Sequence, residues 1–288
     1  MKNSRSIYEK IDGIPGSWIR YFAYIIVVIV ILNPIGLPIA ISKEVSDFSD
    51  AIESLPAGSI VLISNGDSLS GWATRYPAYI ALFNHLFKNN IKPIIWCYTI
   101  EGTLVQLEII KAVNPEGKYG AIYGEDWAFF GYTAGQEAAF RSVASNFRDT
   151  YSIDYYGNSI DDLTVMDGID NIEDMAPLII SFSTSMEAIG WHVRQFNLPY
   201  GKKIITISSG TDIGAILPYY PQIILGYLAA GAQSAAEYEI LIKMPGAGAT
   251  FTDSMSLLTI YLFLILIITN IVGRGLKSGL RVKKEGLR

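Results

Sequence analysis

Asp67 and Ser68 come nearest to a catalytic pair in this sequence. They directly follow Ser59–Ser64, an apolar run whose β-branched residues predict a strand buried on both faces. A serine at the end of such a strand can act as a nucleophile when a histidine takes its proton and an acidic residue orients that histidine. The chain has two histidines, His85 and His192, and neither lies three residues after an acidic residue. The sequence therefore offers a nucleophile without an evident base.

The pentapeptide GDSLS at Gly66–Ser70 resembles the first block of the GDSL esterases, in which the serine after the first strand is the nucleophile. This resemblance implies ester hydrolysis by Ser68. The same enzymes carry a G-x-N-D block, and the nearest segment here, GIDN at Gly168–Asn171, departs from it. The alternative is a polar turn that contains Asp67 and Ser68, and we favour that interpretation.

Metal and cofactor chemistry have less support in the sequence. The turn GYTAGQ at Gly131–Gln136 is not a G-x-G-x-x-G fingerprint, and no P-loop motif is present. The acidic stretch Asp161–Asp174 lacks the spacing of a calcium loop. Cys97, the only cysteine, lies in an apolar run and is expected to be a buried, inert thiol. We therefore predict no metal and no cofactor.

Apolar runs of strand length alternate with helical patterns through the middle of the chain. This alternation predicts an α/β domain of three layers around a mostly parallel, five-stranded sheet, with flavodoxin-like or Rossmann-like topology. The five expected strands are Ser59–Ser64, Pro93–Tyr98, Trp127–Tyr132, Leu178–Phe182 and Ile204–Ser208.

Ligands bind beyond the carboxyl ends of the strands in sheets of this kind. Small and polar residues occur at those ends in this sequence, as a binding site would require. The candidate ligand-binding residues are Asn65, Asp67, Thr99, Glu101, Tyr132, Thr133, Ser183, Ser209 and Asp212.

Half of the residues are hydrophobic, and two uncharged stretches are long enough to cross a bilayer. The first covers residues 21–41 and is expected to kink at Pro34, Gly36 and Pro38, and the second covers residues 255–272. A cleaved signal peptide is a weaker explanation of the first stretch, because about 20 residues precede it and no A-x-A site follows. The sequence thus predicts two transmembrane helices.

The distribution of charge predicts the orientation of the chain. Lysine and arginine are concentrated in the tails, residues 1–20 and 273–288, so the positive-inside rule makes both tails cytoplasmic. Residues 42–253 hold 24 acidic and 12 basic residues, a net charge of −12. The expected protein is a two-pass protein of the cell membrane whose α/β domain lies outside. Its acidity disfavours nucleic acid as a partner.

The segment Pro218–Lys243 is expected to be a closing helix that joins the α/β domain to the second span. An alternative, a third span at Ile213–Ala236, is disfavoured by its prolines and glutamines. Small residues in the segment would let another helix approach closely, which favours self-association or docking of another membrane protein. The candidate interface residues are Gly226, Ala230, Gly231 and Ser234.

Several segments together resemble a family of membrane-anchored prokaryotic proteins with no assigned activity. Its members carry a GYKPG-like turn, a DYYG-like loop and a helix ending in GAAEYE before a C-terminal span. The matching segments here are Tyr123–Phe140, Asp154–Gly157, Pro218–Gln222 and the GAQSAAEYE that ends at Glu239. Gln233 and Ser234 depart from the family pattern. The resemblance implies a shared fold and assigns no catalytic residue.

Two classes of function remain open. The first is a structural or assembly role at the membrane, which requires no catalytic set. The second is ligand binding or esterase-like catalysis at the strand ends. The sequence favours the first and does not decide whether the protein is an enzyme.

Overall fold

The computed structural model describes residues 7–33, 35–229 and 231–285. Pro34, Ala230 and the ends of the two basic tails therefore lie outside the described residues. The chain forms two compact units, each described by itself. Unit 1 comprises Met1–Leu37 and Thr250–Arg288, and unit 2 comprises Pro38–Ala249.

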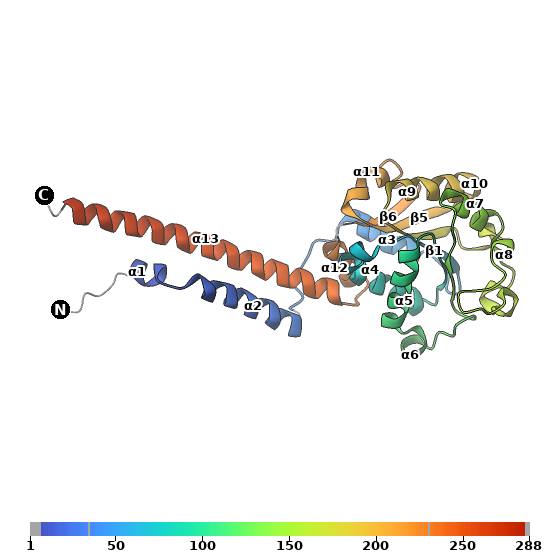
Figure 1. Ribbon diagram of the computed structural model, residues 1–288, viewed down its shortest axis with the longest axis horizontal. Coiled ribbons are helices and arrows are strands. Elements are labelled where there is room, and N and C mark those ends of the chain that lie inside the picture. The colour runs from blue at the N-terminus through green and yellow to red at the C-terminus, as the bar shows by residue number, and fades with distance from the viewer. Residues whose placement is uncertain (1–6, 34, 230, 286–288) are drawn as a thin grey trace. The chain divides into compact units, whose positions relative to one another are not determined.

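Unit 2 is an α/β domain built on one sheet, in which each pair of neighbouring strands is parallel (Figure 1). The sheet has six strands, so the prediction of five was wrong. The strands are β1 Ile60–Asn65, β2 Lys92–Cys97, β3 Ala128–Tyr132, β4 Leu178–Ser183, β5 Lys203–Ser208 and β6 Ile224–Leu228.

The additional strand, β6, lies within the segment that was expected to be a closing helix. Its residues pair with β5, with Ile204 opposite Ile224 and Ile207 opposite Leu228. Proline at 218 and 221 disfavours a continuous helix here, and the apolar residues that follow suit a strand covered on both faces. A helix begins only at Ala232, where α12 covers Ala232–Leu241.

The strand order is β3-β2-β1-β4-β5-β6. This is the Rossmann order and not the flavodoxin order, so the structure selects one of the two expected topologies. The order reverses between β1 and β4. Ligand sites in open α/β sheets form at such a reversal, beyond the carboxyl ends of the strands.

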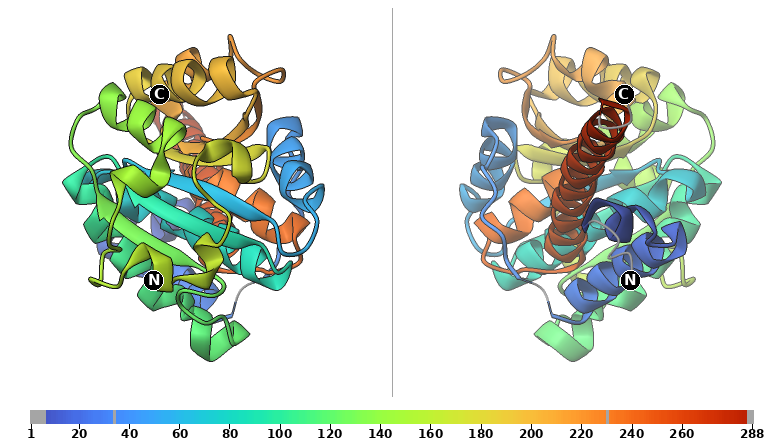
Figure 2. Two further views of the ribbon diagram at one scale, coloured as in Figure 1. Left: turned by 90° about the vertical axis from the view of Figure 1, so that its right-hand side faces the viewer. Right: turned by 90° about the vertical axis from the view of Figure 1, so that its left-hand side faces the viewer.

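Helices cover both faces of the sheet, as Figure 2 shows. Successive residues of β1 point to opposite layers, with Ile63 in one core cluster and Leu62 in the other. The layer on the Ile63 side contains α3 Lys43–Glu53, α4 Leu69–Lys88, α5 Ile100–Val113 and α12. The layer on the Leu62 side contains α7 Glu137–Ser145, α8 Phe147–Thr150, α9 Met186–His192, the π-helical turn η4 Val193–Asn197 and α11 Ile213–Ile216.

Unit 1 contains the short helix α1 Ile7–Asp12, the apolar helix α2 Gly16–Leu32 and most of α13 Ala247–Glu285. In the described part of the chain, one helix is long and apolar enough to cross a membrane, the portion Ala247–Gly275 of α13. The predicted first span at residues 21–41 is not continuous, because α2 ends at Leu32. Asn33 precedes a proline, which disfavours helical backbone there. Since 17 residues give about 25 Å of helix, α2 is shorter than a bilayer core.

Polar contacts join α2 and its following loop to α13 within unit 1. The Tyr261 hydroxyl donates to the carbonyl oxygen of Ile19 at 2.9 Å. The buried carboxylate of Asp253 accepts the backbone N–H groups of Ile35, Gly36 and Leu37 at 2.8–3.0 Å. The Asp253 contacts satisfy backbone N–H groups beyond the end of α2, where helical hydrogen bonding has stopped.

Helix α12 binds the two ends of unit 2, the segment at Ser42 and the segment at residues 246–249. The Glu237 carboxylate accepts from the backbone N–H of Ser42 at 2.9 Å and from its hydroxyl at 2.6 Å. The Glu239 carboxylate accepts N–H groups of Gly246, Gly248 and Ala249 at 2.8–3.0 Å, at the start of α13. The AEYE segment, residues 236–239, thus holds the chain both before α3 and at the start of α13.

Candidate functional site

A cavity of about 550 Å³ opens at the carboxyl ends of β1 to β4, where the strand order reverses. Its volume is within the range of about 300–1,000 Å³ that small-molecule sites occupy. Four of the nine predicted ligand-binding residues line it, namely Asp67, Thr99, Glu101 and Tyr132, together with the candidate nucleophile Ser68. The remaining lining residues are Gly66, Tyr98, Ile100, Gln136, Thr184, Ser185 and Trp191.

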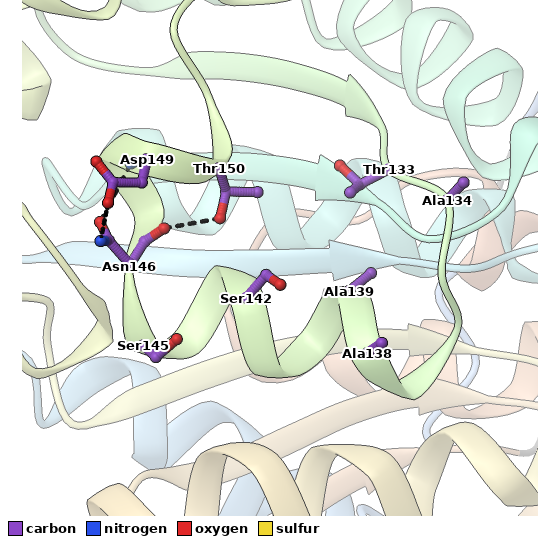
Figure 3. Close-up of a pocket in the computed structure, with 9 residues that line it drawn as sticks. All are labelled: Thr133, Ala134, Ala138, Ala139, Ser142, Ser145, Asn146, Asp149 and Thr150. Atoms are coloured by element: carbon purple, nitrogen blue, oxygen red, sulfur yellow. Dashed lines mark hydrogen bonds between the residues drawn. The ribbon is translucent and has the colours of Figure 1, made fainter.

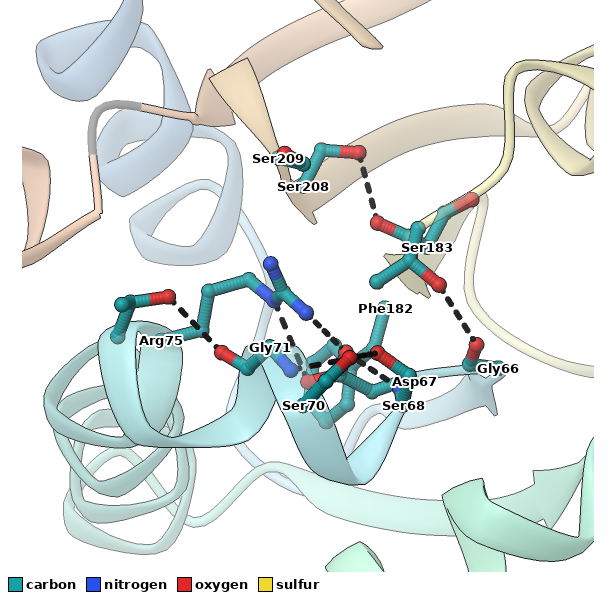
Figure 4. Close-up of polar contacts among 12 residues, drawn as sticks. Gly66, Asp67, Ser68, Ser70, Gly71, Arg75, Phe182, Ser183, Ser208 and Ser209 are labelled. Carbon is teal, nitrogen blue, oxygen red and sulfur yellow. Dashed lines mark hydrogen bonds and ion pairs between the residues drawn. The ribbon is translucent and has the colours of Figure 1, made fainter. Parts of the chain in front are cut away.

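Asp67 is fully buried at the first turn after β1. Its carboxylate forms an ion pair with Arg75, accepts the Tyr79 hydroxyl and accepts the backbone N–H of Ser68 at 2.7 Å. Figure 4 shows the Arg75 guanidinium beside Asp67. The ion pair and the two hydrogen bonds offset the cost of burying the Asp67 side chain away from water. Asp67 therefore organises this turn, and all its contacts arise inside unit 2.

Side chains already occupy the N-terminus of α4. Glu101, at the start of α5, accepts the backbone N–H of Leu69 at 2.7 Å through Oε2. Ser68 is the N-cap of α4 and accepts the N–H of Gly71 at 3.3 Å through Oγ. The first turn of α4, where a Rossmann-type dinucleotide site would bind phosphate, thus carries a carboxylate and a hydroxyl.

Gly66 lines the cavity and lies against the ring of Tyr98. A Cβ atom at Gly66 would fall 1.9 Å from a Tyr98 ring carbon, so this position has no room for a larger residue. Tyr98 donates its hydroxyl to the carbonyl oxygen of Phe182 at 3.0 Å, and burial raises the pKa of Tyr98. The glycine is therefore explained by aromatic packing and not by the approach of a ligand.

The walls of the cavity include two partly exposed aromatic rings, Tyr132 at 44% exposure and Trp191. Trp191 packs edge-on against Tyr98, with 6.4 Å between ring centroids. Gln136, at the N-cap of α7, has φ +50° and ψ −127°. Such backbone is strained for a residue with a side chain, and strain of this kind concentrates at functional sites.

Neither histidine serves Ser68 as a base. His192 contacts Ser64 Oγ through Nε2 and the carbonyl oxygen of Ala188 through Nδ1. The ring nitrogens of His85 contact Tyr238 and Glu53. The Ser68 hydroxyl caps α4 and contacts Ser70. This geometry matches the polar turn and lacks the serine–histidine contact that an esterase requires.

Four of the predicted ligand-binding residues do not reach the cavity. Asn65 is buried and donates to Gln106 at 3.0 Å. Ser183 is buried, and Asp212 accepts the backbone N–H of Ser209 at 3.2 Å in a capping box. These polar groups are satisfied inside the fold, so a polar strand end alone did not identify the site.

Thr133, another predicted residue, lines a separate cavity of about 450 Å³ between α7 and α8 (Figure 3). Small residues such as Ala138 and Ser142 form much of its wall, and Asp149 is its one ionisable lining residue among those the structure describes. The Asp149 side chain already accepts from Asn146. This second cavity therefore presents little chemistry.

Two of the four predicted interface residues, Gly226 and Ser234, are packed within unit 2. Gly226 lies in β6 beneath α3, and a Cβ atom there would fall 2.2 Å from the backbone nitrogen of Phe48. Ser234 is buried in α12, Gly231 has φ +57°, and Ala230 lies outside the described residues. The close approach that small residues permit thus occurs between elements of the same chain.

Sequence reasoning missed Trp191 and Gln136 in the cavity wall. Trp191 comes from the helix after β4 and not from a strand end, and its large ring on a helix beside the sheet edge is the signal that could have found it. Cys97 is buried as predicted, and burial raises its thiol pKa. Among the described residues, no group of three His, Cys, Asp or Glu side chains is arranged to hold a metal ion.

No known family, curated protein or solved structure matches this chain.

Proposed function

We propose that this protein is a membrane-anchored binding protein that holds a small polar molecule in the strand-end cavity of unit 2. One observation carries the proposal: a cavity of ligand size, at the reversal of strand order, lined from β1, β2, β3 and β4. The serine, glutamate and aromatic side chains on its wall can fix the orientation of a ligand. No histidine is among the described residues that line the cavity, so the serine has no base beside it. We therefore favour binding over hydrolysis.

The assembly role that the sequence favours has less support. Its candidate residues Gly226 and Ser234 are buried inside unit 2, where a partner would not reach them without rearrangement. Membership of the family with DYYG-like and AEYE segments remains a proposal, and it is compatible with a shared binding fold.

We retain the two-pass arrangement as part of the proposal. Ala247–Gly275 of α13 would supply one span, and residues 21–41, the stretch expected from the sequence, would supply the other. The basic tails would then be cytoplasmic and unit 2 extracytoplasmic. A cysteine-accessibility experiment tests this, because a cysteine introduced at Asp167 should react with an impermeant maleimide in intact cells and one introduced at Lys10 should not.

The binding proposal can be tested with the full-length protein in detergent. Thermal unfolding is measured against a panel of amines, sugars, carboxylic acids and nucleotides, with Thr184→Trp to fill the cavity. A compound present at about 100 times its Kd should stabilise the wild type by about 2.7 kcal/mol and leave Thr184→Trp unaffected. Ala138→Trp is the matched control, since it places the same ring in the separate cavity between α7 and α8.

Ile100→Trp provides a second blocking variant if Thr184→Trp does not fold, because Ile100 is 66% exposed and also lines the cavity. A panel in which no compound distinguishes the blocked variants from Ala138→Trp would contradict the proposal.

A further inference from the structure

The charge on the cavity wall discriminates between classes of ligand. Of the described residues that line the cavity, none is lysine, arginine or histidine, and two are acidic. Asp67 is neutralised by Arg75, whereas Glu101 is exposed and has no cationic partner among the described residues. An anionic ligand would meet the Glu101 charge without compensation.

The backbone donors of the α4 N-terminus do not reverse this preference. The N–H groups of Ser68, Leu69 and Gly71 are donated to Asp67, Glu101 and Ser68 respectively, at 2.7, 2.7 and 3.3 Å. A phosphate would have to displace these side-chain oxygens before it could use the helix N-terminus. The N-terminus of α4 is therefore poorly suited to the phosphate of a nucleotide, although the strand order is that of nucleotide-binding folds.

The same wall is well suited to a cation. Glu101 uses Oε2 for the Leu69 N–H, which leaves Oε1 to accept from a ligand. The rings of Tyr132 and Trp191 line the same cavity, and aromatic faces attract ammonium groups within about 6 Å. A carboxylate and aromatic rings around one cavity form the combination that binds substituted ammonium ions.

We infer that the ligand is a small organic ammonium compound, with its charged nitrogen beside Glu101 and the rings of Tyr132 and Trp191. This inference rests on the proposed binding function. The hydroxyl groups of Thr184 and Ser185, also on the wall, hydrogen-bond polar groups that the compound carries elsewhere.

Choline and its uncharged isostere dimethylbutanol, in which carbon replaces the nitrogen, test the inference on the full-length protein in detergent. Calorimetric titration should give choline at least about tenfold tighter binding than dimethylbutanol. Glu101→Gln should remove most of this difference, because the amide oxygen still accepts the Leu69 N–H while the charge is lost. Glu108→Gln on the same helix is the control, since Glu108 is exposed and does not line the cavity.

Three results overturn the inference while leaving the binding function intact. They are equal affinities for choline and dimethylbutanol, choline binding unchanged in Glu101→Gln, and tighter binding of adenosine monophosphate that Thr184→Trp abolishes. If no compound in the wider panel distinguishes Thr184→Trp and Ile100→Trp from Ala138→Trp, both proposals fail together.

Discussion

Acid should destabilise unit 2 through His192, which is 1% exposed in the core layer beside β1. Nδ1 donates to the Ala188 carbonyl oxygen at 2.6 Å, and Nε2 accepts from the Ser64 hydroxyl. Both ring nitrogens are thus satisfied in the neutral form. A second proton would place a charge among the rings of Tyr98, Phe140 and Phe196. Burial lowers the pKa of His192 to about 4.

The lowered pKa of His192 makes the free energy of unfolding depend on pH. An unfolded histidine has a pKa of about 6.5, so between that value and the folded pKa the unfolded chain binds more protons. The stability that depends on neutral His192 is fully present above about pH 6.5 and is lost as the pH falls from there to the folded pKa, with about 3 kcal/mol gone near pH 4. About 2 kcal/mol of this should be lost between about pH 7.5 and about pH 5.

Two measurements check the result on the full-length protein. In His85→Gln the remaining histidine gives one signal from isotope-labelled imidazole, which should stay that of the neutral ring down to about pH 5. Urea unfolding should show a smaller acid loss in the double variant His85→Gln/His192→Gln than in His85→Gln alone. The His85→Gln background is needed because burial lowers the pKa of His85 too. A signal that titrates between about pH 6 and 7 in the folded protein would refute the reasoning.

Two packing predictions use the same unfolding assay. Gly226→Ala should lower the free energy of unfolding by about 1–3 kcal/mol, because the new methyl group meets the α3 backbone. Gly214→Ala is the control and should lower it far less, because a Cβ atom there has no neighbour within 4 Å. Equal losses in the two variants would contradict the close approach of α3 to Gly226. Arg75→Met should lower the free energy of unfolding by about 3–5 kcal/mol, because it leaves Asp67 buried without a cation. The double variant Asp67→Asn/Arg75→Met should recover part of that loss. No recovery in the double variant would argue against the ion pair as the cause.

The class of fold was predictable because apolar periodicity reports burial directly. β1, β2, β4 and β5 each contain consecutive apolar residues, as is typical of strands covered on both faces. β6 was missed because glycine and alanine in and after it suggested a helix interface. Gly226 instead allows the backbone of α3 to pack directly against β6.

The site was only partly predictable, because the position of a residue at a strand end does not determine the direction in which its side chain points. Asn65 and Asp67 are two residues apart at the end of β1, yet one bonds α5 inside the fold and the other lines the cavity. Trp191 enters the wall from a helix, so no strand-end rule could include it. The GDSLS turn resembled a catalytic block because a helix N-cap and a nucleophile both require a serine after a strand.

The acidity of the middle segment also has a structural component. Glu101 accepts a backbone N–H at the start of α4, Glu239 accepts three at the start of α13, and Glu237 accepts that of Ser42, the N-cap of α3. Helix starts present N–H groups without intrahelical partners and favour negative charge. The excess of carboxylates therefore reflects helix starts held by distant acids as well as a charged surface. Glu101 thus both accepts a backbone N–H at the start of α4 and places a negative charge on the cavity wall, where a phosphate would otherwise use that helix start.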